Sequence, residues 1–196
     1  MRVRKIFVVS VVAVLATVAM PASSKEVDIS REGNWRIWYT SPDLRAELDY
    51  HWADLHPGDE WLLLKLSVAG GLAGGVTPVN RKNVMVKAPD GAITMLPSQA
   101  DFRAVRGSME VAFQQENSWG PSASRFRNSY VRILDWFFSP PGTTFHREFI
   151  APSATQYCSG PLVFRIPGGV QPGEWTLIFE LGEMQAEIPF VLGEKN

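Results

Sequence analysis

Apolar and polar residues alternate over much of the chain between residues 34 and 52. Trp35, Ile37 and Tyr39 occupy every second position, and a second alternating series runs from Leu44 to Trp52. A period of two places successive side chains on opposite faces of a strand, so residues 34–52 are predicted to form half-buried strands. The Thr-Ser-Pro-Asp sequence that separates the two series predicts a turn.

Seven further segments are predicted to form strands. The nearly continuous apolar run at 61–69 predicts a central strand buried on both faces. Residues 84–88 and 92–96 flank Pro-Asp-Gly and predict a hairpin. Beyond residue 142, strands are predicted at 143–150, 157–166, 175–181 and 185–192. Pro189 lies in the last of them, and because proline has no N–H to donate, it predicts an edge strand or a bulge.

The pattern changes between residues 98 and 138. Two series of apolar residues recur there at intervals of three or four, which is the spacing of one helix face. Ser98 and Asp101 resemble a capping box at the start of the first series. The sequence therefore predicts a two-helix insertion over 98–138, ended by Ser-Pro-Pro-Gly. The first series is Phe102, Val105, Met109, Ala112 and Phe113, and the second is Phe126, Tyr130, Ile133, Leu134 and Phe137.

The order of these elements predicts the fold class. Strands come first, then the helical pair, then strands again, and this order differs from the strand-helix alternation of a parallel α/β sheet. Residues 25–196 are therefore predicted to form a single, mainly β domain, an antiparallel β-sandwich that carries the insertion at 98–138. The C-terminal sequence Pro-Gly-Glu-Trp-Thr-Leu-Ile-Phe, followed by Ile188 to Leu192, resembles the last hairpin of immunoglobulin-like domains in exported bacterial proteins. That resemblance implies an immunoglobulin-like sandwich and carries no activity with it.

The N-terminal residues resemble an export signal. Arg2, Arg4 and Lys5 precede an uncharged apolar run over 6–20, and small residues follow it. This order is typical of a secretory signal peptide, and we expect cleavage near residue 24. The run is shorter than the roughly 20 residues of a membrane helix, although an uncleaved anchor is the alternative. The sequence thus predicts a periplasmic or secreted protein, with no membrane span after cleavage.

Charge and cysteine content exclude several classes of function. The formal net charge is −1, and residues 1–24 contain three of the 19 basic residues and no acidic one. The remaining chain is mildly acidic, which argues against a nucleic-acid binder. A single cysteine, Cys158, excludes an internal disulfide, the one between immunoglobulin sheets included, and also a cysteine-rich zinc module. A buried thiol is the favoured interpretation of Cys158, and an oxidation-sensitive thiol or an intermolecular disulfide is the alternative.

No motif for catalysis or for a cofactor is assembled in the sequence. There is no Gly-x-Ser-x-Gly elbow, and no cofactor is predicted. A weak metal-site hypothesis uses His51, Asp54, His56 and Asp59, but their spacing matches no established ligand set. A solvated polar turn explains these four residues more simply.

Two groups of residues are candidates for binding. Arginine is concentrated in the insertion, where it suits contacts with carboxylates or with a partner protein, and Trp119 lies in a polar loop beside it. Trp38 is out of phase with the neighbouring alternation, so Trp38 and Trp119 are expected to expose rings that could stack on a ligand. The partner-binding candidates are Arg103, Arg106, Arg125, Arg127, Arg132 and Trp119.

The sequence favours a non-catalytic, exported binding or accessory domain that contacts another protein of the cell envelope. The alternative is a binder of a small ligand or a carbohydrate, with a hydrolase as a further alternative. The sequence pattern indicates no oligomeric state and identifies no specific partner.

Overall fold

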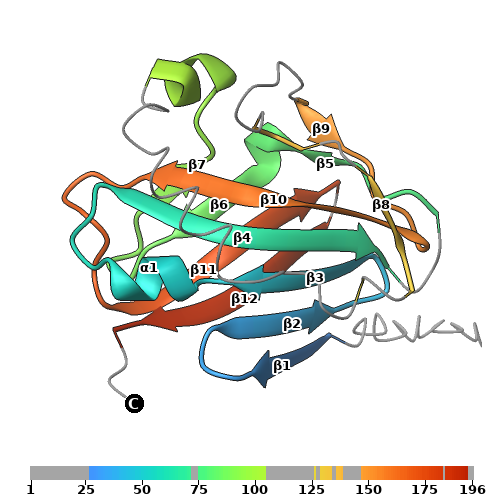
Figure 1. Cartoon of the computed structure of the whole chain (residues 1–196), viewed down its shortest axis with the longest axis horizontal. Coiled ribbons are helices and arrows are strands. Elements are labelled where there is room, and N and C mark those ends of the chain that lie inside the picture. Colours follow the sequence, from blue (N-terminus) through green and yellow to red (C-terminus); the bar gives the residue numbers. More distant parts are fainter. Residues whose placement is uncertain are drawn as a thin grey trace, which may run out of the picture.

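The computed structural model describes residues 27–71, 75–104, 126, 129–133, 136–138, 147–182 and 184–193. Within them the chain is mainly β, as predicted. Strands β1 to β4 follow one another in a meander, with the short helix α1 between β3 and β4 (Figure 1). The first elements are β1 (Asp28–Glu32), β2 (Arg36–Thr40), β3 (Leu44–Asp49), α1 (His51–Leu55), β4 (Trp61–Gly70), β5 (Val79–Asn80), a 3₁₀ turn (Arg81–Asn83), β6 (Val84–Lys87) and β7 (Ile93–Met95). The later ones are β8 (Val131–Ile133), β9 (Phe149–Ile150), β10 (Gln156–Arg165), β11 (Gly173–Leu181) and β12 (Met184–Leu192).

Two sheets contain most of these strands. The larger sheet has the order β1-β2-β3-β4-β10-β8, and all its pairs are antiparallel except the parallel pair of β8 with β10. The smaller sheet has the order β12-β11-β6-β7 and is antiparallel throughout. Strands β5 and β9 form a separate short pair. The predicted hairpins β6–β7 and β11–β12 are both present, and Pro189 lies on the edge strand β12, as expected.

One continuous hydrophobic core joins the two sheets. Leu48 and Leu66 of the larger sheet belong to the same buried cluster as Trp175 and Phe190 of the smaller one. The rings of Tyr50 and Phe190 approach to 5.4 Å between centroids. Strand β4 is buried along most of its length, which confirms the central strand predicted at 61–69. The burial of apolar side chains on the facing sides of both sheets therefore holds the layers together.

The second predicted helix of the insertion is wrong at residues 131–133. These residues form strand β8, which pairs in parallel with Gln156 to Cys158. The residues of the supposed helical stripe do not share one face, because Phe126 packs on Trp38 and Tyr157 whereas Phe137 lies in the core between the sheets. Pairing with the edge of β10 therefore overrides the local helical spacing.

The first predicted helix begins where the capping box suggests. Residues 99–104 are helical, and the Asp101 backbone N–H donates to the Ser98 hydroxyl at 3.2 Å. Residues 105–125, which carry the rest of the predicted helix, lie outside the described residues.

A second local difference concerns residues 51–55, which form α1 where the alternation to Trp52 predicts a strand.

Two side chains bond to carbonyls of β10 just beyond its pairing with β8. Beyond Cys158, the Ser159 carbonyl accepts a hydrogen bond from Arg132, and the Pro161 carbonyl accepts one from the Trp136 indole at 2.6 Å. Trp136 lies so close to Gly160 that a Cβ atom there would come within 2.4 Å of its ring. A glycine is therefore required at position 160 for the indole to seat against the strand.

Arg81 connects the 3₁₀ turn to both flanks of the segment that follows β7. Its side chain is 4% exposed and donates to the carbonyls of Pro97, Phe137 and Arg147. The guanidinium also lies 3.4 Å from a carboxylate oxygen of Glu148 and stacks over the ring of Phe138. Because Pro97 precedes the insertion and Arg147 follows it, this one side chain fixes both ends of the insertion to the sheets.

Candidate functional site

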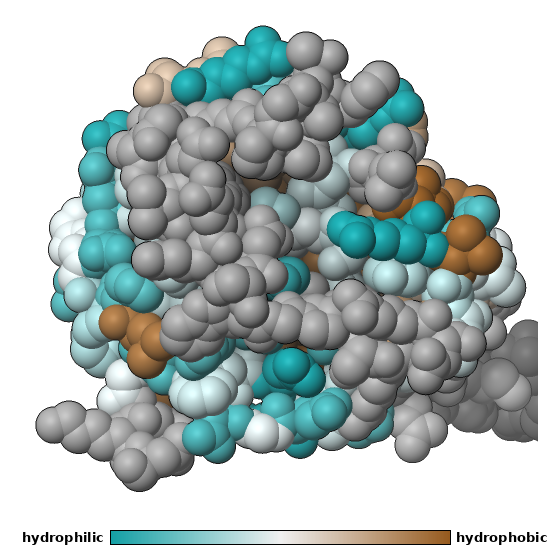
Figure 2. Space-filling view, in the orientation of Figure 1, coloured by the Kyte–Doolittle hydropathy of each residue, from teal (hydrophilic) through white to brown (hydrophobic). Residues whose placement is uncertain are grey.

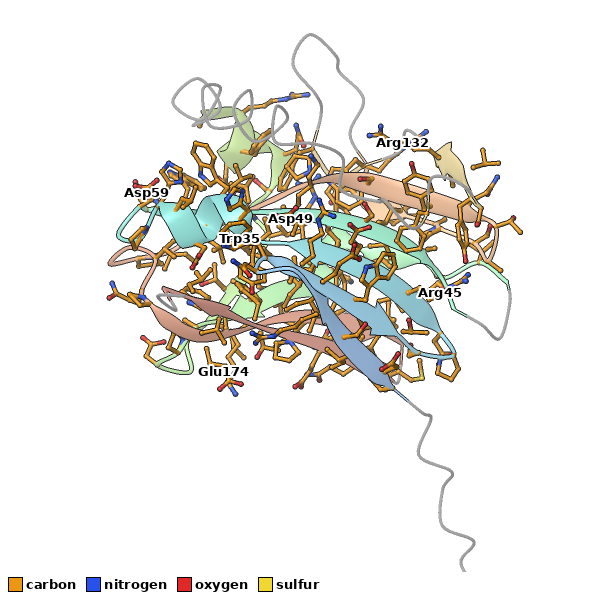
Figure 3. All side chains as sticks on the ribbon, turned by 60° about the horizontal axis from the view of Figure 1, so that its bottom comes forward. Trp35, Arg45, Asp49, Asp59, Arg132 and Glu174 are labelled. Atoms are coloured by element: carbon orange, nitrogen blue, oxygen red, sulfur yellow. The ribbon has the colours of Figure 1, made fainter. Side chains whose placement is uncertain are left out.

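A pocket opens where the β1–β2 hairpin turns, beside the start of α1. Its volume is about 580 Å³. Figure 3 shows Trp35 and Asp49 close together at this end of the larger sheet, with Arg45 toward the other end of β3. We call it the hairpin-end pocket. Its lining residues are Glu32, Gly33, Asn34, Trp35, Arg36, Asp49 and His51.

The turn that forms the pocket is fixed by backbone contacts. Gly33 has a φ of +66°, a conformation that glycine adopts without strain. The Tyr50 backbone N–H donates to the Trp35 carbonyl at 3.0 Å, and the Tyr50 hydroxyl donates to the Asn34 carbonyl at 2.8 Å. These two bonds tie the hairpin turn to the end of β3, so the walls of the pocket hold a defined separation.

Arg36 lies between two carboxylates of the neighbouring strand. Its Nε atom is 3.5 Å from Asp49 and 3.9 Å from Glu47. The side chain of Arg36 is 30% exposed, whereas that of Glu47 is fully buried. Within the part of the chain that the structure describes, neither η nitrogen of Arg36 makes a hydrogen bond. Arg36 therefore presents donors at the pocket while its Nε balances the buried charge behind it.

A row of polar side chains continues from Glu47 across the outer face of the larger sheet. Glu47, Ser67 and Ser159 occupy matched positions on β3, β4 and β10. Glu47 and Ser67 are fully buried, and the Ser67 hydroxyl donates to that of Ser159 at 2.8 Å. Apolar residues of the same strands face the core on the opposite side. The outer face of the sheet next to the pocket therefore carries buried polar side chains.

His51 and Trp35 close one side of the pocket. Their ring centroids are 3.9 Å apart, and the Trp35 indole N–H donates to Asp54 at 2.8 Å. Asp54 also accepts a hydrogen bond from the Gly193 backbone N–H at 2.6 Å, which links α1 to the C-terminal strand. Burial lowers the pKa of His51 below its ordinary value of 6.5, and Asp49 and Asp54 oppose this shift only in part.

This shift predicts a pH dependence of stability. Because the pKa of His51 is lower in the folded state than in the unfolded state, folding favours its neutral form. Its contribution is present above the unfolded pKa of about 6.5 and is lost as the pH falls through the folded pKa. Urea unfolding at about pH 7.5 and pH 5.5 should show a larger loss of stability for the natural protein than for His51→Gln. Equal losses in the two proteins would contradict the expectation.

The four residues of the weak metal hypothesis are engaged in other contacts or lie apart from one another. Among the described residues, no group of three or more His, Cys, Asp or Glu side chains is placed to hold a metal ion. Asp54 accepts from Trp35 and Gly193, and His56 stacks on Trp52 with centroids 3.8 Å apart. His51 lines the pocket, and Asp59 is exposed in the turn before β4.

Of the partner-binding candidates, the structure describes two. Arg103 is exposed among the helical residues 99–104, and Arg132 is exposed on β8. Arg106, Arg125, Arg127 and Trp119 lie outside the described residues. Arg103 and Arg132 are not among the residues that line the hairpin-end pocket.

Trp38 does not expose its ring, contrary to expectation. It is 6% exposed, donates to Glu32 at 3.1 Å and packs against Phe126. The side chain faces away from the core, as its phase implies, but a second small cluster with Ala69 and Tyr157 covers it on that side. A ligand-stacking role for Trp38 is therefore not supported.

Cys158 occupies a central position of β10. Its side chain is fully buried in the core and lies opposite Val68 of β4 and Ile133 of β8. This placement agrees with the interpretation of a buried thiol. Solvent reagents reach such a thiol only when the strands around it open.

Sequence patterns did not identify Trp35, Arg36, Glu47 or Asp49 as site residues. The available signal was the series Arg45, Glu47 and Asp49, which gives β3 a wholly charged outer face. Pairing with β2 then brings Arg36 opposite Asp49.

Among the described residues, no helix has the length and apolar character needed to cross a membrane. A scan against protein-family models and searches of curated proteins and of solved structures find no match to this chain.

Proposed function

We propose that this protein is a non-catalytic, exported binding protein that holds a small polar ligand in the hairpin-end pocket. The observation that carries the proposal is Arg36, a half-buried cation that lines the pocket and makes no hydrogen bond from its η nitrogens to any described residue. A positioned guanidinium with donors to spare is suited to recognising the oxygen atoms of a ligand.

The size and lining of the pocket support this role. Its volume of about 580 Å³ lies within the range of small-molecule sites. Asn34 and Asp49 add an amide and a carboxylate, and Trp35 adds an apolar surface. The contacts of Tyr50 with the hairpin turn lie entirely within the chain and support the shape of the pocket.

Filling the pocket with an added ring should abolish binding. The Asn34 side chain makes no hydrogen bond to a described residue, so Asn34→Trp is expected to fill the volume without breaking the fold. Ligand-observed NMR with a library of small polar fragments should give signals for the natural protein that disappear in Asn34→Trp. Glu174→Trp places the same ring on an exposed position of β11 and should retain them (Figure 3). The proposal fails if the natural protein binds no fragment, or if Asn34→Trp keeps every signal.

A second candidate function is contact with another protein of the cell envelope. Arg103 and Arg132 are exposed, and Val131 next to Arg132 is 66% exposed on a three-residue edge strand. Figure 2 shows small hydrophobic patches on one face of the molecule with hydrophilic residues beside them. Affinity capture from envelope extract with the natural protein and with Arg103→Ala/Arg132→Ala tests it. Equal recovery of all partners would remove these residues from the contact.

We also retain the immunoglobulin-like sandwich as a proposal for the finer fold. The β11–β12 hairpin and the shared core of the two sheets support it. The meander β1-β2-β3-β4 within one sheet differs from the immunoglobulin arrangement, in which strands A, B, E and D form one sheet and strands C, F and G form the other. The resemblance thus extends furthest at the C-terminal hairpin from which it was drawn.

A further inference from the structure

We infer that the ligand of the hairpin-end pocket is a neutral carbohydrate, held through adjacent hydroxyl groups by the Arg36–Asp49 pair. The inference rests on the proposed function, because it names the chemical class of ligand for the same pocket. Three features of the pocket support it: the donors and acceptors in its lining, the balance of charge around Arg36 and the fixed position of Trp35.

The Arg36–Asp49 pair offers a donor and an acceptor side by side. Nε of Arg36 is 3.5 Å from the Asp49 carboxylate, so the guanidinium and the carboxylate lie side by side, and both residues line the pocket. Asp49 accepts a hydrogen bond from the His51 backbone N–H at 3.1 Å, and a carboxylate has room for further donors. A hydroxyl group both donates and accepts. Two neighbouring hydroxyls can therefore bind this pair together, one donating to Asp49 and one accepting from Arg36.

The charges around Arg36 favour a neutral ligand. Glu32 and Asp49 line the pocket, and the buried Glu47 lies 3.9 Å from Arg36. Lys65 of β4 lies opposite Asp49 in the strand register. An anion that approaches Arg36 meets the carboxylates of Glu32, Asp49 and Glu47. A cation that approaches those carboxylates meets Arg36 itself. Each charge of the pocket thus lies near a charge of the opposite sign, so hydroxyl groups match the pocket better than a charged group.

Trp35 supplies the apolar surface that a sugar ring requires. Its indole is half-buried, its N–H is bonded to Asp54, and its ring lies against His51. These contacts fix the orientation of the indole before a ligand arrives, which reduces the entropy lost on binding. Asn34, on the same turn, adds an amide that can donate to one hydroxyl and accept from another.

The test follows the Trp35 indole N–H signal by NMR, assigned with Trp35→Phe, during titration with four classes of probe. The probes are neutral hexoses and their disaccharides, uronic acids, amino sugars, and amino acids. We expect a neutral sugar to shift the Trp35 signal in a saturable way. Asp49→Asn keeps the shape of the side chain but removes its charge, and it should weaken binding by about tenfold or more. Asp90→Asn, on the exposed β6–β7 turn, should leave binding unchanged.

The outcomes separate the two proposals. Saturable binding of amino acids, amino sugars or uronic acids without binding of any neutral sugar would overturn the carbohydrate inference and leave the pocket function standing. Neutral-sugar binding that is unaffected by Asp49→Asn would also overturn the role of the Arg36–Asp49 pair. If no probe shifts the Trp35 signal but the fragment library still binds in a manner sensitive to Asn34→Trp, only the inference fails. If neither the probes nor the fragments bind, the proposed function fails as well.

Discussion

Replacing Arg81 with Ala should lower the free energy of unfolding by at least about 3 kcal/mol, because buried acceptors that lose a hydrogen-bond donor cost about 1–3 kcal/mol each. The guanidinium donates to the carbonyls of Pro97, Phe137 and Arg147, and it is 4% exposed. No neighbouring side chain on the same element can replace a forked donor of this kind. Urea unfolding followed by Trp fluorescence would measure the loss.

Arg165→Ala is the matched control for the Arg81 variant. Arg165 also pairs with a carboxylate, Glu60, at 2.6 Å, but both side chains are more than half exposed. Exposed ion pairs contribute about 0–1 kcal/mol, so this variant should unfold close to the natural protein. Arg81→Lys keeps the charge without the fork and should fall between the two. A loss for Arg81→Ala no greater than that for Arg165→Ala would show that Arg81 does not hold the ends of the insertion.

Trp136→Ala is expected to destabilise the fold by about 3–5 kcal/mol, the range for removing a large buried aromatic side chain. Trp136 is 5% exposed, belongs to the main core and donates to the Pro161 carbonyl at 2.6 Å. The substitution removes the buried ring and also leaves that carbonyl without its indole donor. Thermal and urea unfolding, followed by circular dichroism, would measure the effect.

A double-mutant cycle with Gly160 shows whether the indole is what restricts that position. A Cβ atom at residue 160 would lie 2.4 Å from the Trp136 ring, so Gly160→Ala alone should be strongly destabilising. In the Trp136→Ala background these nearest contacts are removed, so the same change should have a much smaller effect. Equal effects in both backgrounds would mean that another contact, and not the Trp136 ring, requires glycine at position 160.

The sequence predicted the sheets well where side-chain alternation alone decides the structure. The runs around Ile37, Leu48 and Leu177 became strands whose apolar sides face the shared core. Pro189 correctly indicated an edge, because a residue without an N–H is excluded from central positions. In these segments the local pattern and the tertiary packing demand the same conformation.

Prediction failed where a partner distant in the sequence decides the structure. Tyr130 and Ile133 follow a helical spacing with Phe126 and Phe137, yet residues 131–133 pair with β10, about 25 residues further along the chain. Spacing also could not show that the outer face near Trp38 is covered. A period of two tells which side of a sheet a residue occupies, but it does not tell what packs on that side.

The candidate site could be predicted only in part for the same reason. The charged outer face of β3 is visible in the sequence as Arg45, Glu47 and Asp49. The proximity of Arg36 and the full burial of Glu47 depend on the register of β2 with β3 and on the coverage of the sheet. Trp35 was assigned to a strand, whereas its contact with His51 depends on the turn and on α1, which the alternation did not predict.

The bonded carbonyls of β10 have a consequence for how molecules of this protein meet one another. An open sheet edge can pair with the edge of another molecule and so begin aggregation. On β10, the carbonyls of Ser159 and Pro161 are occupied by Arg132 and Trp136, and Pro161 itself has no N–H to offer. At these two positions an incoming strand meets acceptors that are already bonded, so the two side chains that stabilise the fold also oppose pairing between copies there.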